Sequence, residues 1–123
     1  MTDDRLPPPA ILIVEDDKLQ KLLAVDLVEE AGFVAIEACD ADEAVAILET
    51  RSDIVLVLTD INMPGSMDGL KLAHAVRSRW PPIKIIVVSG RGLASELPKD
   101  VLFFAKPYQT DAMISEIRSL IAR

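Results

Sequence analysis

The chain has 123 residues, half of them hydrophobic, and a formal net charge of -7 at pH 7. This length suits one domain with its own core. The acidic balance argues against direct nucleic-acid binding, which requires a basic surface. The single cysteine, Cys39, cannot form an internal disulfide, so we expect a reducing, cytoplasmic location and a structural role for it. The first residues are acidic and lack the apolar core of a signal segment, and no apolar run approaches the ~18 residues of a membrane span, so no membrane association is predicted.

The first half of the chain alternates short apolar segments with helical patterns. Residues 1–9 are predicted to be a flexible tail ending in consecutive prolines. A buried strand follows at Ala10–Val14, and Val34–Ala38 is a weaker strand suited to a sheet edge. Between them a helix is predicted from Leu19, Leu22, Leu23 and Leu27, which recur at helical spacing, with Asp17 as N-cap and Gly32 as its end. Asp40 or Asp42 begins the next helix, whose buried face is Ala44, Val45 and Leu48.

The second half continues this alternation. The run Ile54–Thr59 is short, apolar and rich in β-branched residues, which is typical of a strand buried on both faces of a parallel sheet. Further strands are predicted at Ile83–Val88 and Val101–Phe104. A helix through Leu70, Ala73, Val76 and Arg77 ends at Trp80 before two prolines, and the last helix has the apolar stripe Met113, Ile114, Ile117, Leu120 and Ile121. The stretch from Arg91 to Asp100 contains Gly92 and Pro98, so only about one turn of helix is expected, around Leu93 to Leu97.

Strands that alternate with helices predict an α/β fold with a doubly wound, five-stranded parallel sheet, occupying residues 10–123 as one domain. Right-handed crossovers and one reversal of winding favour the strand order 2-1-3-4-5 of flavodoxin-like folds. In this order the first and third strands are neighbours at the centre of the sheet. Functional groups are then expected just beyond the carboxyl ends of the strands.

Acidic residues follow the two central strands of this arrangement. Glu15, Asp16 and Asp17 end the first strand, and Asp60 ends the third. Carboxylates ~4 Å apart repel each other by about 4 kcal/mol at an effective dielectric of ~20, so the cluster requires a proton or a cation. Oxygen ligands favour Mg²⁺ or Mn²⁺ and suggest metal-assisted phosphate chemistry. The alternative is that Glu15 and Asp17 are solvated loop acids that cap a helix.

Two further strand ends carry polar groups. Ser89 follows the fourth strand with a hydroxyl, and Lys106 follows the fifth with an ammonium group. Each residue alone has an ordinary explanation, Ser89 as a turn residue and Lys106 as a surface lysine. Together with a carboxylate nucleophile and a metal, they supply the donors that phosphoryl transfer requires.

With these features, the chain from Ala10 to Arg123 resembles a response-regulator receiver domain of two-component signalling. The matching segments are Ile11-Leu12-Ile13-Val14-Glu15-Asp16-Asp17, Thr59-Asp60-Ile61-Asn62-Met63-Pro64, Met67-Asp68-Gly69, Val88-Ser89-Gly90 and Lys106-Pro107. Their spacings are close to those of the family throughout. The resemblance implies a signalling switch rather than an enzyme with a separate substrate.

The resemblance also implies roles for individual residues. Asp60 would accept a phosphoryl group from a sensor histidine kinase or a histidine phosphotransfer protein. Mg²⁺ (or Mn²⁺) would be held by Glu15, Asp16, Asp60 and the backbone carbonyl of Asn62. Ser89 and Lys106 would bind phosphoryl oxygens, with Ser89 shifting on activation and the Lys106-Pro107 bond cis. Phe103 occupies the position of the family's aromatic switch residue.

Two features depart from the family pattern. The segment between Ser89 and Phe103 is short, so we expect the fourth helix to be short or irregular. In many receivers this helix contributes to the surface that signals or dimerises. Phe103 also lacks the hydroxyl of a tyrosine, so it would act by burial alone or be an ordinary core residue.

Other interpretations of the sequence fit its residues less well. A metal-dependent phosphohydrolase with an aspartyl nucleophile usually has a second acid nearby and a cap, but Asn62 occupies that place. Flavin binding is disfavoured by the three acids after the first strand, and a degenerate receiver scaffold by the complete set of site residues. His74 is predicted to lie in the middle of a helix, away from the acidic residues, at the surface or half-buried. Arg91 is predicted either near the site or in solvent. The downstream partner, and whether the domain stands alone or belongs to a hybrid histidine kinase, are not indicated.

Overall fold

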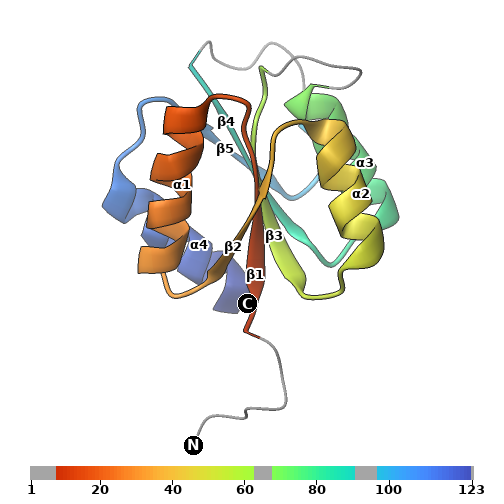
Figure 1. Cartoon of the computed structure of the whole chain (residues 1–123), viewed down its shortest axis with the longest axis horizontal. Helices are drawn as coiled ribbons and strands as arrows, with labels where there is room; N and C mark the ends of the chain where they lie inside the picture. The colour runs from red at the N-terminus through yellow and green to blue at the C-terminus, as the bar shows by residue number, and fades with distance from the viewer. Residues whose placement is uncertain (1–7, 63–67, 91–96, 123) are drawn as a thin grey trace, which may run out of the picture.

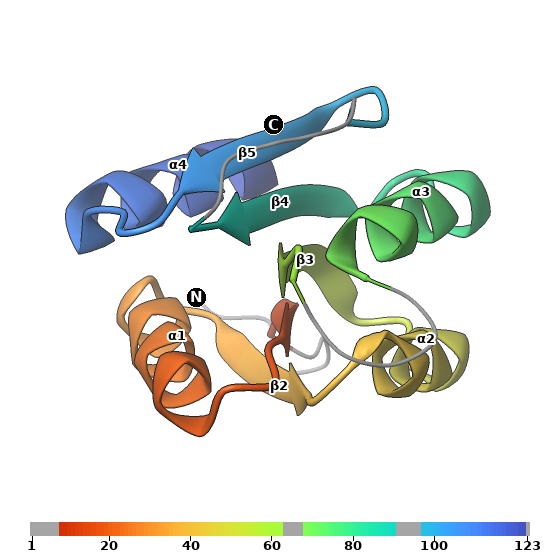
Figure 2. The same cartoon turned by 90° about the horizontal axis from the view of Figure 1, so that it is seen from above.

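The computed structural model describes residues 8–62, 68–90 and 97–122. Within these ranges, parallel strands form a five-stranded sheet in the predicted order β2-β1-β3-β4-β5 (Figures 1 and 2). The strands are β1 (Ala10–Val14), β2 (Val34–Ala38), β3 (Ile54–Asp60), β4 (Lys84–Ser89) and β5 (Val101–Ala105). The helices are α1 (Lys18–Glu30), α2 (Ala41–Thr50), α3 (Gly69–Arg79) and α4 (Thr110–Ala122). The predicted fold class and strand order are confirmed.

Some predictions concern residues outside these ranges. These residues are most of the N-terminal tail, Met63-Pro64 and Met67 of the segments that resemble the family, and Arg91. The helical turn expected around Leu93 to Leu97 also falls mainly on residues that are not described. The described part of that segment, Leu97–Asp100, contains a turn and no helix before β5 begins.

The helices cover the two faces of the sheet in pairs. α1 and α4 lie on one face, and α2 and α3 lie on the other (Figures 1 and 2). Successive strand residues point to opposite faces, so each strand contributes to both halves of the core. In β1, Ile11 and Ile13 pack toward α1 and α4, while Leu12 and Val14 pack toward α2 and α3. Every residue of β1 is buried, and β3 is buried at all but one position, which explains their unbroken apolar sequences.

Aspartate side chains begin three of the helices, each accepting a hydrogen bond from the first turn. Asp17 accepts from the backbone nitrogen of Gln20 at 2.9 Å, Asp40 from Glu43 at 2.8 Å, and Asp68 from Lys71 at 2.9 Å. Asp17 is the predicted N-cap of α1, and Asp40 rather than Asp42 is that of α2.

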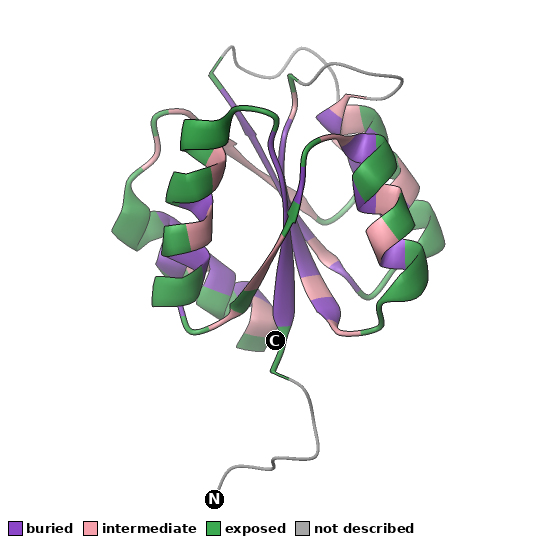
Figure 3. Ribbon diagram, in the orientation of Figure 1, coloured by how far each residue is buried: buried purple, intermediate pink, exposed green. Residues whose placement is uncertain are grey.

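The buried face of α1 differs from the leucine pattern of its sequence. Among the four leucines that indicated the helix, only Leu27 is buried, next to Ala24 and Val28. Leu19, Leu22 and Leu23 are 66%, 56% and 58% exposed, respectively, and we call them the α1 ridge. The buried residues all lie in the second half of α1, and the exposed face of the helix is visible in Figure 3. Helical spacing revealed the helix but not which part of it faces the sheet.

Arg77 joins the end of α3 to the chain that enters β5. Its Nε donates to the carbonyl of Lys99 at 3.0 Å, and its Nη2 donates to that of Asp100 at 3.1 Å. Its Nη1 donates to the carbonyls of Pro81 and Ile83 at 2.6 and 3.3 Å. A rigid, planar guanidinium suits such a set of carbonyls because it presents several donors in fixed directions.

None of the helices in the described ranges has the length and apolar character needed to cross a membrane.

Candidate functional site

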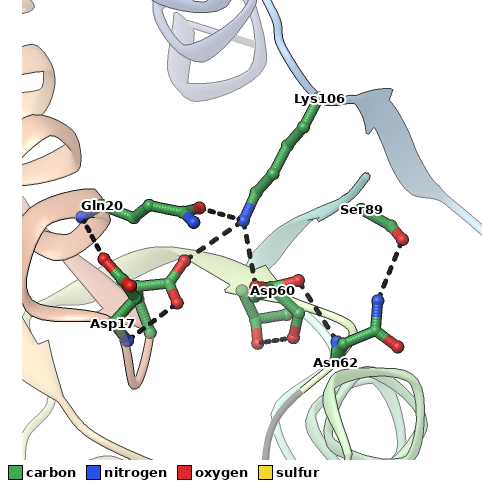
Figure 4. Close-up of polar contacts among 8 residues, drawn as sticks. Asp17, Gln20, Asp60, Asn62, Ser89 and Lys106 are labelled. Carbon is green, nitrogen blue, oxygen red and sulfur yellow. Dashed lines mark hydrogen bonds and ion pairs between the residues drawn. The ribbon is translucent and has the colours of Figure 1, made fainter. Parts of the chain in front are cut away.

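Polar groups from four strands meet at the carboxyl edge of the sheet. Asp60 and Ser89 are the last residues of β3 and β4, while Glu15 and Lys106 directly follow β1 and β5. The parallel register aligns these ends, since Val14 pairs with Thr59 and the β3 and β4 ends lie side by side. Figure 4 shows Asp60, Asn62, Ser89 and Lys106 grouped together. The structure therefore brings together the strand-end residues that the sequence singled out.

The acidic part of the site can accommodate a cation. Carboxylate oxygens of Glu15, Asp16 and Asp60 lie within 4.8 Å of one another, the one such group of potential metal ligands found in the described ranges. Glu15 and Asp60 are only 6% and 8% exposed, whereas Asp16 is open to solvent. Three converging oxygen donors, two of them poorly hydrated, match the preference of Mg²⁺ or Mn²⁺ for carboxylate ligands with a remaining hydrated side.

Lys106 lies between two of these acids and a side chain of α1. Its Nζ donates to Asp60 Oδ2 at 3.0 Å and to Glu15 Oε1 at 3.3 Å. It also donates to Gln20 Oε1 in a short hydrogen bond. The Lys106-Pro107 peptide is cis, as the family resemblance implied. The site thus places an ammonium group directly beside the Asp60 carboxylate, where it can bind a further anionic group.

Burial and charge shift the protonation of these groups. Burial raises the pKa of Glu15, and the charge of Asp60 adds to this, although the hydrogen bond from Asp17 and the nearby Lys106 oppose it. Burial by itself would lower the pKa of Lys106, but the hydrogen bond to Asp60 and the charges of both acids outweigh it and raise the pKa. Lys106 therefore stays charged, while Glu15 would gain from a nearby cation.

Asn62 connects the loop after β3 with the end of β4. Its backbone nitrogen donates to Asp60 Oδ1 at 3.2 Å, and its side-chain Nδ2 donates to Ser89 Oγ at 3.2 Å. Thr59, fully buried, donates its hydroxyl to the Asp60 carbonyl at 3.0 Å. These bonds orient both the carboxylate and the backbone of Asp60.

Other singled-out residues lie in various places. Phe103 is half-buried in β5 opposite Val87, and its role as a switch stays a prediction. His74 is exposed on α3, consistent with its predicted surface position. Cys39 is exposed after β2, where its sulfur lies 3.2 Å from Lys21 Nζ.

Two residues at the site have contacts that were not predicted from the sequence. Gly69, at the start of α3, lies against the backbone of Asp60: a Cβ atom there would come 1.9 Å from the Asp60 carbonyl oxygen. The second is Gln20, an exposed glutamine in the first turn of α1. Gly69 belongs to a segment that resembles the family, but nothing indicated its contact with Asp60, and nothing in the sequence around Gln20 indicated a contact with Lys106.

A groove extends from the acidic residues between α1 and α4. It has a volume of about 890 Å³, and Asp60, Lys106 and Leu23 are among the residues that line it. Its walls are apolar where the sheet forms them, at Ile13, Leu58 and Val88. Acidic residues Asp26, Glu29 and Glu30 of α1 also contribute.

Comparison with known proteins agrees with this fold. A family model for the response regulator receiver domain matches residues 11–118. Receiver domains are signalling modules of two-component systems. The chain belongs to the response regulator receiver domain family.

Curated relatives include both small and large proteins. The chain is 29% identical to the response regulator receiver protein CpdR of Brucella abortus, over 90% of its own length and 95% of that protein. It is also 29% identical to the sensor kinase CckA of the same organism, over 92% of its own length but only 12% of that protein. It is 32% identical to DctD, a transcriptional regulatory protein of C4-dicarboxylate transport from Rhizobium meliloti, over 89% of its own length and 25% of that protein.

Solved structures show the same fold. The receiver domain of the hybrid histidine kinase CckA superimposes with a TM-score of 0.78 at 27% identity, over 91% of this chain and 98% of that one. A CheY-like receiver protein from Methanospirillum hungatei gives 0.82 at 26% identity, over 94% and 95% of the two chains. The response regulator TrrA of Thermotoga maritima, solved in complex with Mg²⁺ and BeF, gives 0.77 at 25% identity, over 91% and 98%.

Proposed function

We propose that Asp60 accepts a phosphoryl group and that this modification switches the contacts of the domain with its partners. The observation that carries the proposal is the placement of the Asp60 carboxylate, which is almost fully buried and has Lys106 Nζ 3.0 Å from Oδ2. A nucleophile and a cationic donor are thus already together at a strand end. The domain itself would assist the reaction without acting on a separate substrate.

The acidic cluster would hold the divalent cation that this chemistry needs. Glu15, Asp16, Asp60 and the backbone carbonyl of Asn62 would be its protein ligands, with Mg²⁺ or Mn²⁺ as the ion. When bound, the cation would neutralise charge on the phosphoryl oxygens. The match of an oxygen-only donor set supports this assignment, as does the Mg²⁺ complex of the relative TrrA.

The transfer follows from the groups present. An Asp60 carboxylate oxygen attacks phosphorus and forms a new O–P bond. The bond between phosphorus and the donor nitrogen breaks, and its electron pair stays on the donor histidine. Lys106 pairs with one phosphoryl oxygen, and Ser89 donates its hydroxyl to another. Hydrolysis reverses the modification: water attacks phosphorus, and Asp60 leaves as a carboxylate with inorganic phosphate as product.

The α1 ridge supports a histidine-bearing protein as the phosphoryl donor. Leu19, Leu22 and Leu23 are exposed on the helix that borders the groove, and Leu23 and Asp60 line the same groove. Exposed apolar groups beside a reactive carboxylate favour a protein partner over a small molecule alone. The acids of the groove favour a donor surface that combines apolar and basic side chains.

Asp60 can be tested with small phosphodonors. We expect acetyl phosphate with Mg²⁺ to add one phosphoryl group, detected by mass spectrometry, and beryllofluoride to bind in its place. Asp60→Asn should abolish both. Phosphorylation that persists in Asp60→Asn would overturn the assignment, and repeated turnover of a small phosphomonoester would instead support a phosphohydrolase.

A further inference from the structure

We propose that Gln20 is a positioning residue for Lys106, one that keeps the ammonium group aimed at the phosphoryl site after phosphorylation. The inference rests on the proposed function of Asp60. Gln20 is in the first turn of α1, 86 residues away from Lys106 in the sequence, yet its side-chain oxygen accepts a short hydrogen bond from Lys106 Nζ. Figure 4 shows Gln20 extending toward Lys106 from the side opposite Asp60 and Ser89.

The side chain of Gln20 starts from a fixed position. Its backbone nitrogen donates to Asp17 Oδ1 at 2.9 Å, which is the capping bond of α1. Gln20 also lines the groove together with Asp60 and Lys106. The residue therefore forms part of the wall of the site, although it belongs to the exposed surface of the helix.

The charges around Lys106 give Gln20 a distinct role. An ammonium group has three donors, and three acceptors surround this one among the described residues: Asp60, Glu15 and Gln20. Phosphorylation would convert the Asp60 carboxylate into an acyl phosphate, and cation binding would engage the Glu15 carboxylate. Gln20 is neutral and has no carboxylate that either event would engage. Of the three acceptors, Gln20 is therefore the one that would be chemically unchanged before and after phosphorylation.

A neutral acceptor suits this task. Its hydrogen bond to the ammonium group already restrains the flexible lysine side chain. Less conformational entropy is then lost when Lys106 binds the phosphoryl group. It adds no negative charge that would repel the incoming phosphoryl oxygens. Lys106 can therefore keep one bond to α1 while another of its donors turns from the carboxylate to the phosphoryl group.

The variant Gln20→Met removes the acceptor and keeps the length of the side chain. We expect it to slow phosphorylation by acetyl phosphate, and to weaken beryllofluoride binding, by about tenfold, the effect of losing one hydrogen bond to a charged group. Mg²⁺ affinity without beryllofluoride and the melting temperature should stay as in the wild type. In the metal-free protein, NMR of the Lys106 ammonium should show faster proton exchange in Gln20→Met.

A double-mutant cycle separates positioning from a general structural effect. In a Lys106→Met background, Gln20→Met should have no further effect on beryllofluoride affinity, because its partner is gone. Gln109→Met makes the same chemical change at another exposed glutamine and should behave as the wild type. The proposal is wrong if Gln20→Met binds beryllofluoride and is phosphorylated like the wild type, or if its defect is equally large without Lys106. A wild-type protein that takes up no phosphoryl group would instead overturn the proposed function of Asp60.

Discussion

Gly69 and the carbonyl group of Asp60 are in direct backbone contact. A Cβ atom on Gly69 would lie 1.9 Å from the Asp60 carbonyl oxygen and 2.8 Å from Cα of Ile61. The Gly69 nitrogen also donates to the Ile61 carbonyl at 2.9 Å. The start of α3 is thus held against the residue that ends β3, and only glycine allows this approach.

We therefore expect Gly69→Ala to destabilise the domain by about 2 kcal/mol or more, because backbone atoms must move apart to admit the methyl group. Intrinsic helix propensity would act in the opposite direction, since alanine favours a helix over glycine by ~1 kcal/mol. Urea unfolding followed by circular dichroism measures the difference.

The matched control for this substitution is Gly90→Ala. Among the described residues other than its chain neighbours, the nearest atom to a Cβ at Gly90 is Cβ of Lys106, at 4.0 Å, which is an ordinary contact distance. This variant should change stability by less than about 0.5 kcal/mol. Equal stabilities of the two variants would contradict the proposed contact.

Glu15 should make the metal-free domain less stable as pH rises. Its pKa is raised above the ordinary value of 4.5, so the folded state holds a proton that the unfolded chain has already lost. The free energy of unfolding then falls as pH increases from about 4.5 through the folded pKa, and the penalty stays constant above it. Glu15→Gln should remove this penalty and raise the melting temperature in EDTA at pH 7.

The same variant should lose the stabilisation that Mg²⁺ gives the wild type, since Glu15 is a proposed ligand of the ion. Thermal unfolding between pH 4 and pH 8, with EDTA or Mg²⁺, measures both effects. Glu29→Gln removes a like charge from the exposed surface of α1 and serves as the control. A stability difference between wild type and Glu15→Gln that does not change with pH would refute the assignment of the penalty to Glu15.

The α1 ridge should matter for a protein donor and not for a small one. We expect Leu22→Ser to slow phosphotransfer from the cognate histidine kinase or phosphotransfer protein by about tenfold or more, because a leucine buried in an interface contributes ~1.5–3 kcal/mol. Phosphorylation by acetyl phosphate should be unchanged. The measurement is the rate of phosphoryl transfer from each purified donor.

Val34→Thr is the control for the ridge, since Val34 is the other large apolar residue of the described chain with an exposed side chain, and it lies at the start of β2. It should leave both reactions unchanged. Equal slowing of the acetyl phosphate reaction by Leu22→Ser would show that the ridge acts on the site itself rather than on a partner.

Arg77 should contribute to stability through its carbonyl contacts. Arg77→Lys replaces several donors in fixed directions by one flexible ammonium group, and we expect a loss of about 2 kcal/mol. Arg79→Lys is the matched control on the same helix. Arg79 forms an exposed ion pair with Glu49 and lies over the Trp80 ring, so its replacement should cost less than about 1 kcal/mol. Urea unfolding that ranks the two variants the other way would contradict this role.

The features that could be predicted from the sequence were those with local signals. Asp17 caps a helix within three residues of itself, and the unbroken apolar run that ends at Asp60 indicates a central strand. The strand order then brought Asp60, Ser89 and Lys106 to one edge. Other features depend on how the elements pack in three dimensions, which the spacing of residues in the sequence does not specify. The leucine spacing, for example, could not show which turns of α1 pack against the sheet and which are exposed.

Contacts between distant residues were also missed. The bond between Gln20 and Lys106 requires the first turn of α1 to lie beside the end of β5, and neither residue type indicates this by itself. The contact between Gly69 and Asp60 is of the same kind, because the sequence around Gly69 does not indicate which part of the backbone lies against it.

The two carboxylates that accept hydrogen bonds from Lys106 lie at the ends of the two most deeply buried central strands of the sheet. Glu15 follows β1 and Asp60 ends β3, and both strands are buried on two faces. Separating either strand would expose both halves of the core, so local opening there should require nearly the free energy of global unfolding, and amide hydrogen exchange should be slowest there. Under the proposed function, phosphorylation of Asp60 would therefore leave the sheet intact. Its effect would reach the surface through side-chain rotation and loop rearrangement beyond the strand ends.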